Sequence, residues 1–157
     1  MSPFRPPLRP SAPPSRKEAA EAFRSRVSGM IRDFDRYLRN DFLIARMTPE
    51  EAGYVLDQIA LFNREAEHYR AEERIPNRDI ERLIAAGCRL SADLSGKIMG
   101  RMMDVLENSD EGLRLINLQL RDHIRNKHLS TTLLHKAQAV RNETHRNAET
   151  AGLGVIL

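Results

Sequence analysis

The chain has one cysteine, no tryptophan and no apolar run near the roughly 18 to 20 residues that a transmembrane helix needs. A single cysteine cannot form an internal disulfide, and Cys88 stands in an apolar stretch, so we expect a buried thiol. The first residues also lack the apolar core of a secretory signal peptide. Together these absences predict a cytoplasmic protein without a membrane span.

Aromatic residues and prolines are both confined to particular parts of the chain. All five Phe and three Tyr residues lie at or before Tyr69, so the second half must pack with aliphatic and Met side chains, as coiled-coil-like helices do. Six of the eight prolines lie in residues 1–14, together with Arg5 and Arg9. Because proline disfavours helix, this segment is predicted to be a disordered, basic, Pro-rich arm. Docking of this arm onto a partner or onto phosphate is the alternative.

Motifs that carry chemistry are also lacking. The chain has no P-loop, no glycine-rich dinucleotide fingerprint and no nucleophile elbow. Glu65 and His68 form one E-x-x-H pair, whereas helical di-iron sites combine two such pairs with further glutamates. No two histidines stand four residues apart, the spacing that would put two metal ligands on one helical face. We therefore expect no catalytic residue, no metal, no cofactor and no small-molecule substrate.

What the sequence does contain is helical periodicity between clear start signals. Residues 15–147 are predicted to form one helical domain, with apolar residues recurring every three or four positions. The strongest start signal is Thr48-Pro49-Glu50-Glu51, a capping box with proline at the first helical position. The other predicted caps are Ser15, Asn77, and either Ser109 or Asp110. This pattern predicts an all-α fold, an antiparallel bundle of about four long helices.

The last helix leaves two questions open. Its apolar stripe weakens around residues 126–131, so either one long helix extends to about residue 147 or the helix breaks near residues 128–131. Residues 148–157 are predicted to form a flexible, apolar C-terminal tail, because Gly152 and Gly154 precede apolar residues. An apolar tip of this kind could dock in a groove of a partner protein. The predicted partner-binding residues are Leu153, Val155, Ile156 and Leu157.

Charge is distributed unevenly along the predicted helices. Residues 49–74 carry three Lys or Arg against seven Asp or Glu, whereas residues 111–157 carry seven against four. Arg, Lys, Asn and Gln in the last helix are side chains that contact phosphates and base edges. Nucleic-acid binding is therefore an alternative function, and its candidate residues are Arg121, Arg125, Lys127, Lys136, Arg141 and Arg146.

The first functional hypothesis is a non-enzymatic helical protein that binds other proteins. Predicted helices of about 25 to 35 residues exceed what a small bundle needs, and both chain ends carry segments that could bind a partner. An assembly subunit, an adaptor and a chaperone of the export or secretion type all fit this pattern. The expected partner is another protein or further copies of the chain.

Overall fold

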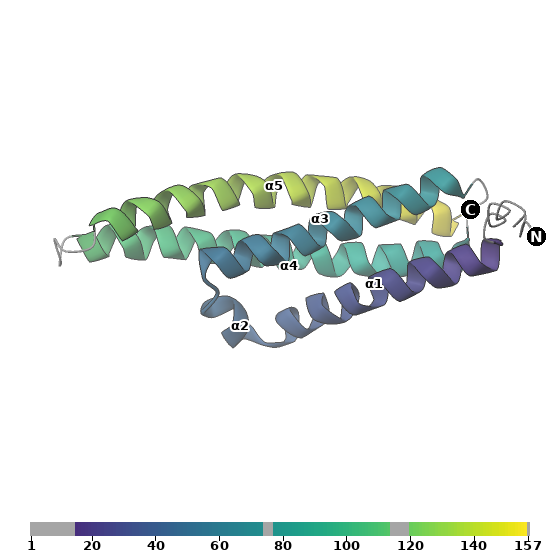
Figure 1. Cartoon of the computed structure of the whole chain (residues 1–157), viewed down its shortest axis with the longest axis horizontal. Coiled ribbons are helices and arrows are strands. Elements are labelled where there is room, and N and C mark those ends of the chain that lie inside the picture. Colours follow the sequence, from purple (N-terminus) through teal and green to yellow (C-terminus); the bar gives the residue numbers. More distant parts are fainter. Residues whose placement is uncertain (1–14, 74–76, 114–119, 157) are drawn as a thin grey trace, which may run out of the picture.

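The computed structural model describes the backbone of residues 15–73, 77–113 and 120–156, and side chains except those of residues 109–123 and 153–156. The described backbone forms five α-helices and no strand: α1 (Arg16–Arg39), α2 (Asp41–Ala45), α3 (Pro49–Glu72), α4 (Arg78–Leu113) and α5 (Leu120–Ile156) (Figure 1). The prediction of an all-α fold is confirmed. None of these helices is long and apolar enough to cross a membrane.

Local sequence signals set the starts of three helices. The backbone N–H of Glu18 donates to the Ser15 hydroxyl, and that of Glu51 donates to the Thr48 hydroxyl, each at 3.2 Å. Asn77 caps α4, because its side-chain oxygen accepts from Asp79 N at 3.0 Å and from Ile80 N at 3.3 Å. These bonds satisfy amide groups that have no partner within the helix, so the predicted caps Ser15, Thr48 and Asn77 are confirmed.

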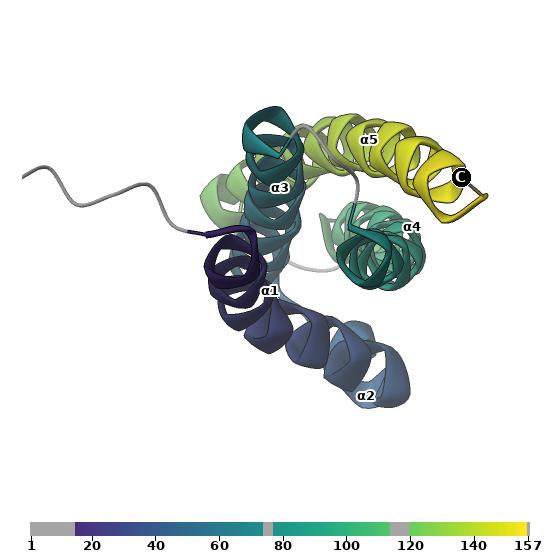
Figure 2. The ribbon, with the colours of Figure 1, turned by 90° about the vertical axis from the view of Figure 1, so that its right-hand side faces the viewer.

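The long helices form two hairpins that pack against each other. Within them, α1 and α3 run antiparallel, as do α4 and α5, which make the most extensive helix pair. Viewed along the long axis, the order around the molecule is α1, α3, α5, α4 (Figure 2). Helix α3 therefore lies beside α5 and α1 beside α4.

Neighbours from different hairpins run in the same direction. Gly53 of α3 faces Leu133, and Asn63, ten residues on, bonds Thr144. Both partners lie further along α5 in the same order, so α3 and α5 are parallel. The antiparallel arrangement that the sequence predicts thus holds within each hairpin but not between α3 and α5.

Aromatic side chains form the part of the core between α1 and α3, and aliphatic side chains form the rest. The rings of Phe23 and Tyr69 lie 4.8 Å apart between α1 and α3, and Phe34 meets Phe62 edge-on at 6.0 Å. Aliphatic and Met side chains complete the core on α4 and α5, among them the fully buried Ile80, Ile84, Leu94, Ile98, Met102 and Ala137. This division follows from the absence of aromatic residues after Tyr69.

Two predicted helix boundaries are wrong. Helix α4 continues to Leu113, past the predicted caps Ser109 and Asp110, because residues of cap type cost only a few tenths of a kcal/mol inside a helix (about 0.5). Helix α5 is continuous through residues 128–131 and runs to Ile156, so residues 148–156 are helical and do not form a separate tail. Ala148 packs on the core and Ala151 is fully buried, which ties this turn to the bundle. The predicted arm, residues 1–14, lies outside the described residues.

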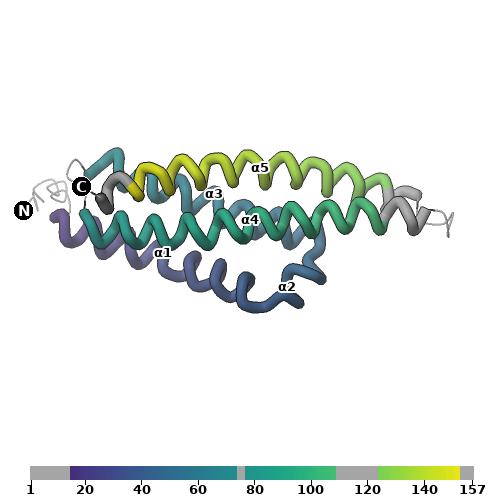
Figure 3. Tube along the Cα trace, turned by 180° about the vertical axis from the view of Figure 1, so that it is seen from behind, coloured from purple at the N-terminus to yellow at the C-terminus, as the bar shows by residue number. Residues whose placement is uncertain are grey.

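The α4–α5 hairpin is longer than the α1–α3 hairpin. Figures 1 and 3 show α4 and α5 extending together past α2 and past the start of α3. The termini-bearing ends of α1 and α5 lie at the opposite end of the molecule. The two ends of the molecule therefore differ, and we refer to them as the α2 end and the terminal end.

Candidate functional site

Large apolar side chains that are exposed gather toward the α2 end. Among the described side chains they are Phe42, Leu43, Tyr54, Met103 and Ile124, with Phe42 72% and Tyr54 63% exposed. Phe42 and Leu43 belong to α2, Tyr54 lies in the second turn of α3, and Met103 and Ile124 lie on the longer hairpin. Single exposed apolar residues are ordinary on any protein, so the candidate contact surface is centred on Phe42 and Leu43, which are adjacent on α2.

Helix α2 forms because Asn40 ends α1 and starts the next helix. Asn40 has extended backbone angles, and its side-chain oxygen accepts a hydrogen bond from Phe42 N at 3.2 Å. Ile44 and Met47 are buried and hold the corner against the bundle. Arg101 of α4 secures it further, because its Nε donates to the Met47 carbonyl oxygen at 3.0 Å. With its inner side chains fixed in this way, α2 presents Phe42 and Leu43 outward.

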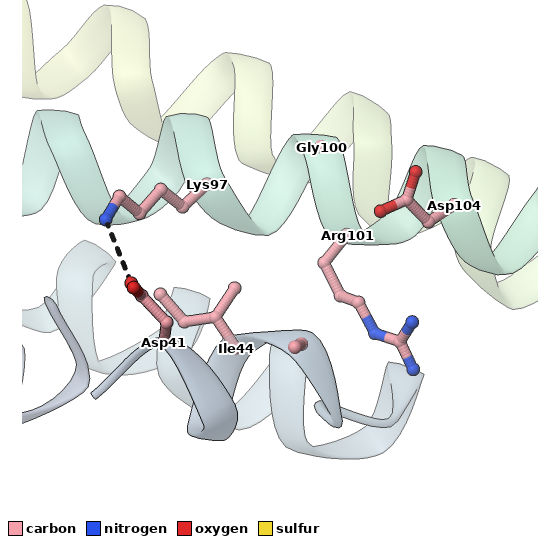
Figure 4. Close-up of a pocket in the computed structure, with 7 residues that line it drawn as sticks. Asp41, Ile44, Lys97, Gly100, Arg101 and Asp104 are labelled. Atoms are coloured by element: carbon pink, nitrogen blue, oxygen red, sulfur yellow. Dashed lines mark ion pairs between the residues drawn. The ribbon is translucent and has the colours of Figure 1, made fainter.

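A shallow pocket of about 380 Å³ separates α2 from α4 (Figure 4). Its charged residues are Asp41, Lys97, Arg101 and Asp104, and Asp41 pairs with Lys97 at 3.8 Å. Two cations and two carboxylates leave no net charge, and the pocket opens broadly to solvent. Gly100 also lines it, and a Cβ added there would meet nothing within 4 Å.

A buried polar network joins α3, α4 and α5 near the terminal end. Arg70 of α3 donates to both carboxylate oxygens of Glu81, at 3.2 and 3.0 Å, and to the Asn147 side-chain oxygen at 3.1 Å. Asn147 donates to Asn63 at 3.0 Å, and Asn63 donates to Thr144 at 3.0 Å. Because these bonds join side chains of α3, α4 and α5, the network fixes the register of three helices. Its side chains are too enclosed to meet a substrate.

The predicted partner-binding residues at the C-terminus are not brought to an identified surface. Leu153, Val155 and Ile156 belong to α5, whereas the sequence predicts a flexible tail. Their side chains, and the whole of Leu157, lie outside the described residues. Gly152, which is expected from the sequence to make the tail flexible, is a helical residue.

The six predicted nucleic-acid-binding residues do not share one face. Arg125, Lys127 and Arg146 are exposed, and the Arg121 side chain is outside the described part. Lys136 instead forms an ion pair with Asp57 of α3. Arg141 is half-buried, packs at about 3.8 Å from the Cβ position of Gly96, and its Nε has no hydrogen-bond partner. Lys136 therefore lies between α5 and α3, whereas Arg141 lies between α5 and α4.

Residues weighed for metal or thiol chemistry have structural partners instead. Glu65 pairs with Arg26 at 2.9 Å, and His68 pairs with Glu72 at 3.2 Å. No group of three or more potential metal ligands occurs among the described residues. Burial raises the pKa of the Cys88 thiol to about 11, so a reactive thiolate is scarce near neutral pH.

One feature of the sequence indicates the α2 end, the apolar Phe42-Leu43-Ile44 run between two helical stripes. Tyr54 and Met103 carried no comparable signal. Comparison with known proteins adds nothing to this picture, because no protein-family model, no curated protein and no solved structure matches the chain.

Proposed function

We infer that this chain is a non-enzymatic helical protein that binds another protein through its α2 end. The observation that carries this inference is the gathering of exposed large apolar side chains there, with Phe42 and Leu43 presented by a helix that is fixed from behind. Burying an exposed aromatic side chain contributes about 1.5 to 3 kcal/mol, so Phe42 is suited to anchor one part of a larger interface.

The scaffold for this function is a four-helix bundle, an antiparallel hairpin α1–α3 joined to an antiparallel hairpin α4–α5. The role of such a scaffold is to hold α2 and the extended α4–α5 hairpin in fixed relative positions. A preorganised surface loses less conformational entropy on binding than a flexible one. An assembly subunit or an adaptor fits this arrangement, with a chaperone as a further possibility within the same class.

The test replaces exposed side chains at each end in matched pairs. Phe42→Gln with Tyr54→Gln removes two apolar groups from the α2 end, whereas Ala22→Gln with Ala71→Gln places two glutamines on exposed positions at the terminal end. Proteins that co-purify with the tagged chain from its source cell are then compared. The inference requires a specific partner that the wild type and the control retain and the α2-end variant loses. Equal retention by all three would overturn it.

Nucleic-acid binding is the second candidate function, and one observation favours it. Arg125 and Arg146 are exposed on α5, and no exposed carboxylate lies between Ile124 and Asn147, whereas Lys136 is paired with Asp57 and Arg141 is half-buried.

A further inference from the structure

One face of α4 points away from the other helices and carries charged residues. The buried positions of α4 include Ile84, Ser91 and Ile98. On the opposite side of the helix lie five of its exposed charged residues: Arg82, Arg89, Asp93, Asp104 and Glu107. At about 100° per residue these five fall within about 60° of one another around the helix axis, so they share one face. In Figure 3, α4 runs along the near side of the molecule, in front of α3. We call these five residues the α4 charged face.

The charges of this face are ordered along the helix and have no partners. Both arginines precede all three carboxylates. None of the five side chains forms an ion pair or a hydrogen bond with any residue that the structure describes. Lys97, at the edge of the face, already pairs with Asp41 and is not counted. In Figure 4, the Arg101 side chain extends toward α2, where its Nε bonds the Met47 carbonyl oxygen, and leaves Asp104 open.

A further unpaired charge lies beside the middle of the face. The Arg141 guanidinium of α5 reaches to between 3.8 and 4.0 Å of the Cβ position of Gly96. Its Nε is buried and has no hydrogen-bond partner. Gly96 and, one turn on, Gly100 carry no side chain, so another helix can approach the backbone closely here. Together with Arg141, the surface holds three cations and three carboxylates.

This surface is complementary to itself when two copies of α4 cross antiparallel. A twofold axis near Gly96 brings Arg82 beside Glu107 of the second copy, with an offset of about 3 Å along the helix at 1.5 Å per residue. The same axis brings Arg89 beside Asp104 of the second copy, with an equal offset. Asp93 of the second copy likewise comes within about two residues of the level of Gly96, where Arg141 lies. Each of these three contacts occurs twice, so every counted charge meets one of opposite sign.

We propose that the α4 charged face binds the same face of a second copy of this chain and forms an antiparallel homodimer. A twofold contact uses one patch on both subunits, so the patch must be complementary to itself, and this ordered set of charges is. With three charges of each sign, the surface offers no net attraction to a polyanion. The contact goes beyond the binding function inferred for the α2 end, because Phe42 and Leu43 do not belong to this face.

Sedimentation equilibrium of the full chain gives the first test. At about 50 mM salt and about 0.1 mM protein the expected mass is twice the 17.9 kDa of one chain, and at about 500 mM salt it should fall toward that of one chain, because salt screens exposed charges. A single-chain mass at the lower salt concentration would overturn the proposal. A dimer that salt does not weaken would overturn it as well.

Two charge-reversal variants test which residues meet. Arg82→Glu with Arg89→Glu makes both halves of the face acidic, and Asp104→Lys with Glu107→Lys makes both halves basic. Each variant alone should lose the dimer through repulsion between like charges. An equal mixture of the two should restore it, because each acidic half then meets a basic half. This recovery requires the antiparallel arrangement and cannot come from a misfolded chain.

The matched control reverses two arginines elsewhere. Arg24→Glu with Arg32→Glu, both exposed on α1, changes the net charge by the same amount and should leave the dimer intact. Circular dichroism checks that each variant is folded. The proposal is overturned if either face variant alone remains dimeric, if the mixture of the two stays monomeric, or if the control loses the dimer as fully as the face variants do.

Discussion

Removing Arg70 should destabilise the protein far more than a surface charge would. The Arg70 side chain is 17% exposed and that of Glu81 8%, so Arg70→Met leaves a carboxylate enclosed without its partner. Removing one member of a buried ion pair costs about 3 to 5 kcal/mol. Because Arg70 keeps some contact with solvent, we expect the lower value, about 3 kcal/mol. A surface pair such as Arg39 with Asp35 should contribute less than about 1 kcal/mol.

A second substitution separates the ion pair from the rest of the network. Arg70→Met with Glu81→Met removes the stranded carboxylate and leaves Asn147 short of the donors that Arg70 supplies. Both variants leave Asn147 without these donors, which costs about 1 to 3 kcal/mol, but only Arg70→Met also keeps the enclosed carboxylate, so the double variant should be the more stable of the two.

Urea unfolding followed by far-ultraviolet circular dichroism measures all three proteins. The free energies of unfolding should rank wild type, then the double variant, then Arg70→Met. If Arg70→Met cost less than about 1 kcal/mol, or if the double variant were no more stable than the single one, the network would not hold the three helices together as described.

Three further predictions concern single positions. Gly87→Ala should destabilise the protein by about 1 to 2 kcal/mol in thermal unfolding, because the added Cβ would overlap the buried Phe62 ring. Gly100→Ala should stabilise it by about 0.8 kcal/mol, because the added Cβ meets nothing within 4 Å. Equal effects of the two substitutions would contradict this packing. Glu143→Gln should raise stability at neutral pH, because it removes a partly buried carboxylate that lies beside Glu67. Because the folded state raises the pKa of Glu143, the wild type gains stability as pH falls through that pKa. The urea unfolding midpoints of the wild type and of Glu143→Gln should therefore converge in acid. A difference between these midpoints that does not change with pH would refute this. Cys88 should react with a thiol reagent only as fast as the protein unfolds, and faster labelling in native buffer would show an exposed thiol.

The sequence predicted those parts of the fold that depend on neighbours along the chain. Ser15, Thr48 and Asn77 cap helices through bonds spanning two or three residues, so their signals are local. The apolar stripes likewise identified buried positions such as Phe23 and Ile59. Helix ends were harder, because the end of α4 depends on where the chain turns and carries no strong local signal.

Features that depend on residues far apart in the chain were out of reach. Asn63 and Asn147 are 84 positions apart, and each reads alone as a polar residue that weakens a helical stripe. The parallel seam of α3 and α5 likewise depends on how two hairpins dock. For the candidate site, charge alone could not show that Lys136 is engaged by Asp57 or that Arg141 is half-buried.

The most direct test of the binding function is site-specific photo-crosslinking in the source cell. A photoreactive residue replaces Phe42 at the α2 end and, in a separate protein, Glu72 at the terminal end, where the side chain is also exposed. The account predicts a discrete crosslinked partner from position 42 and none from position 72. The same adducts from both positions, or adducts from position 72 alone, would contradict it.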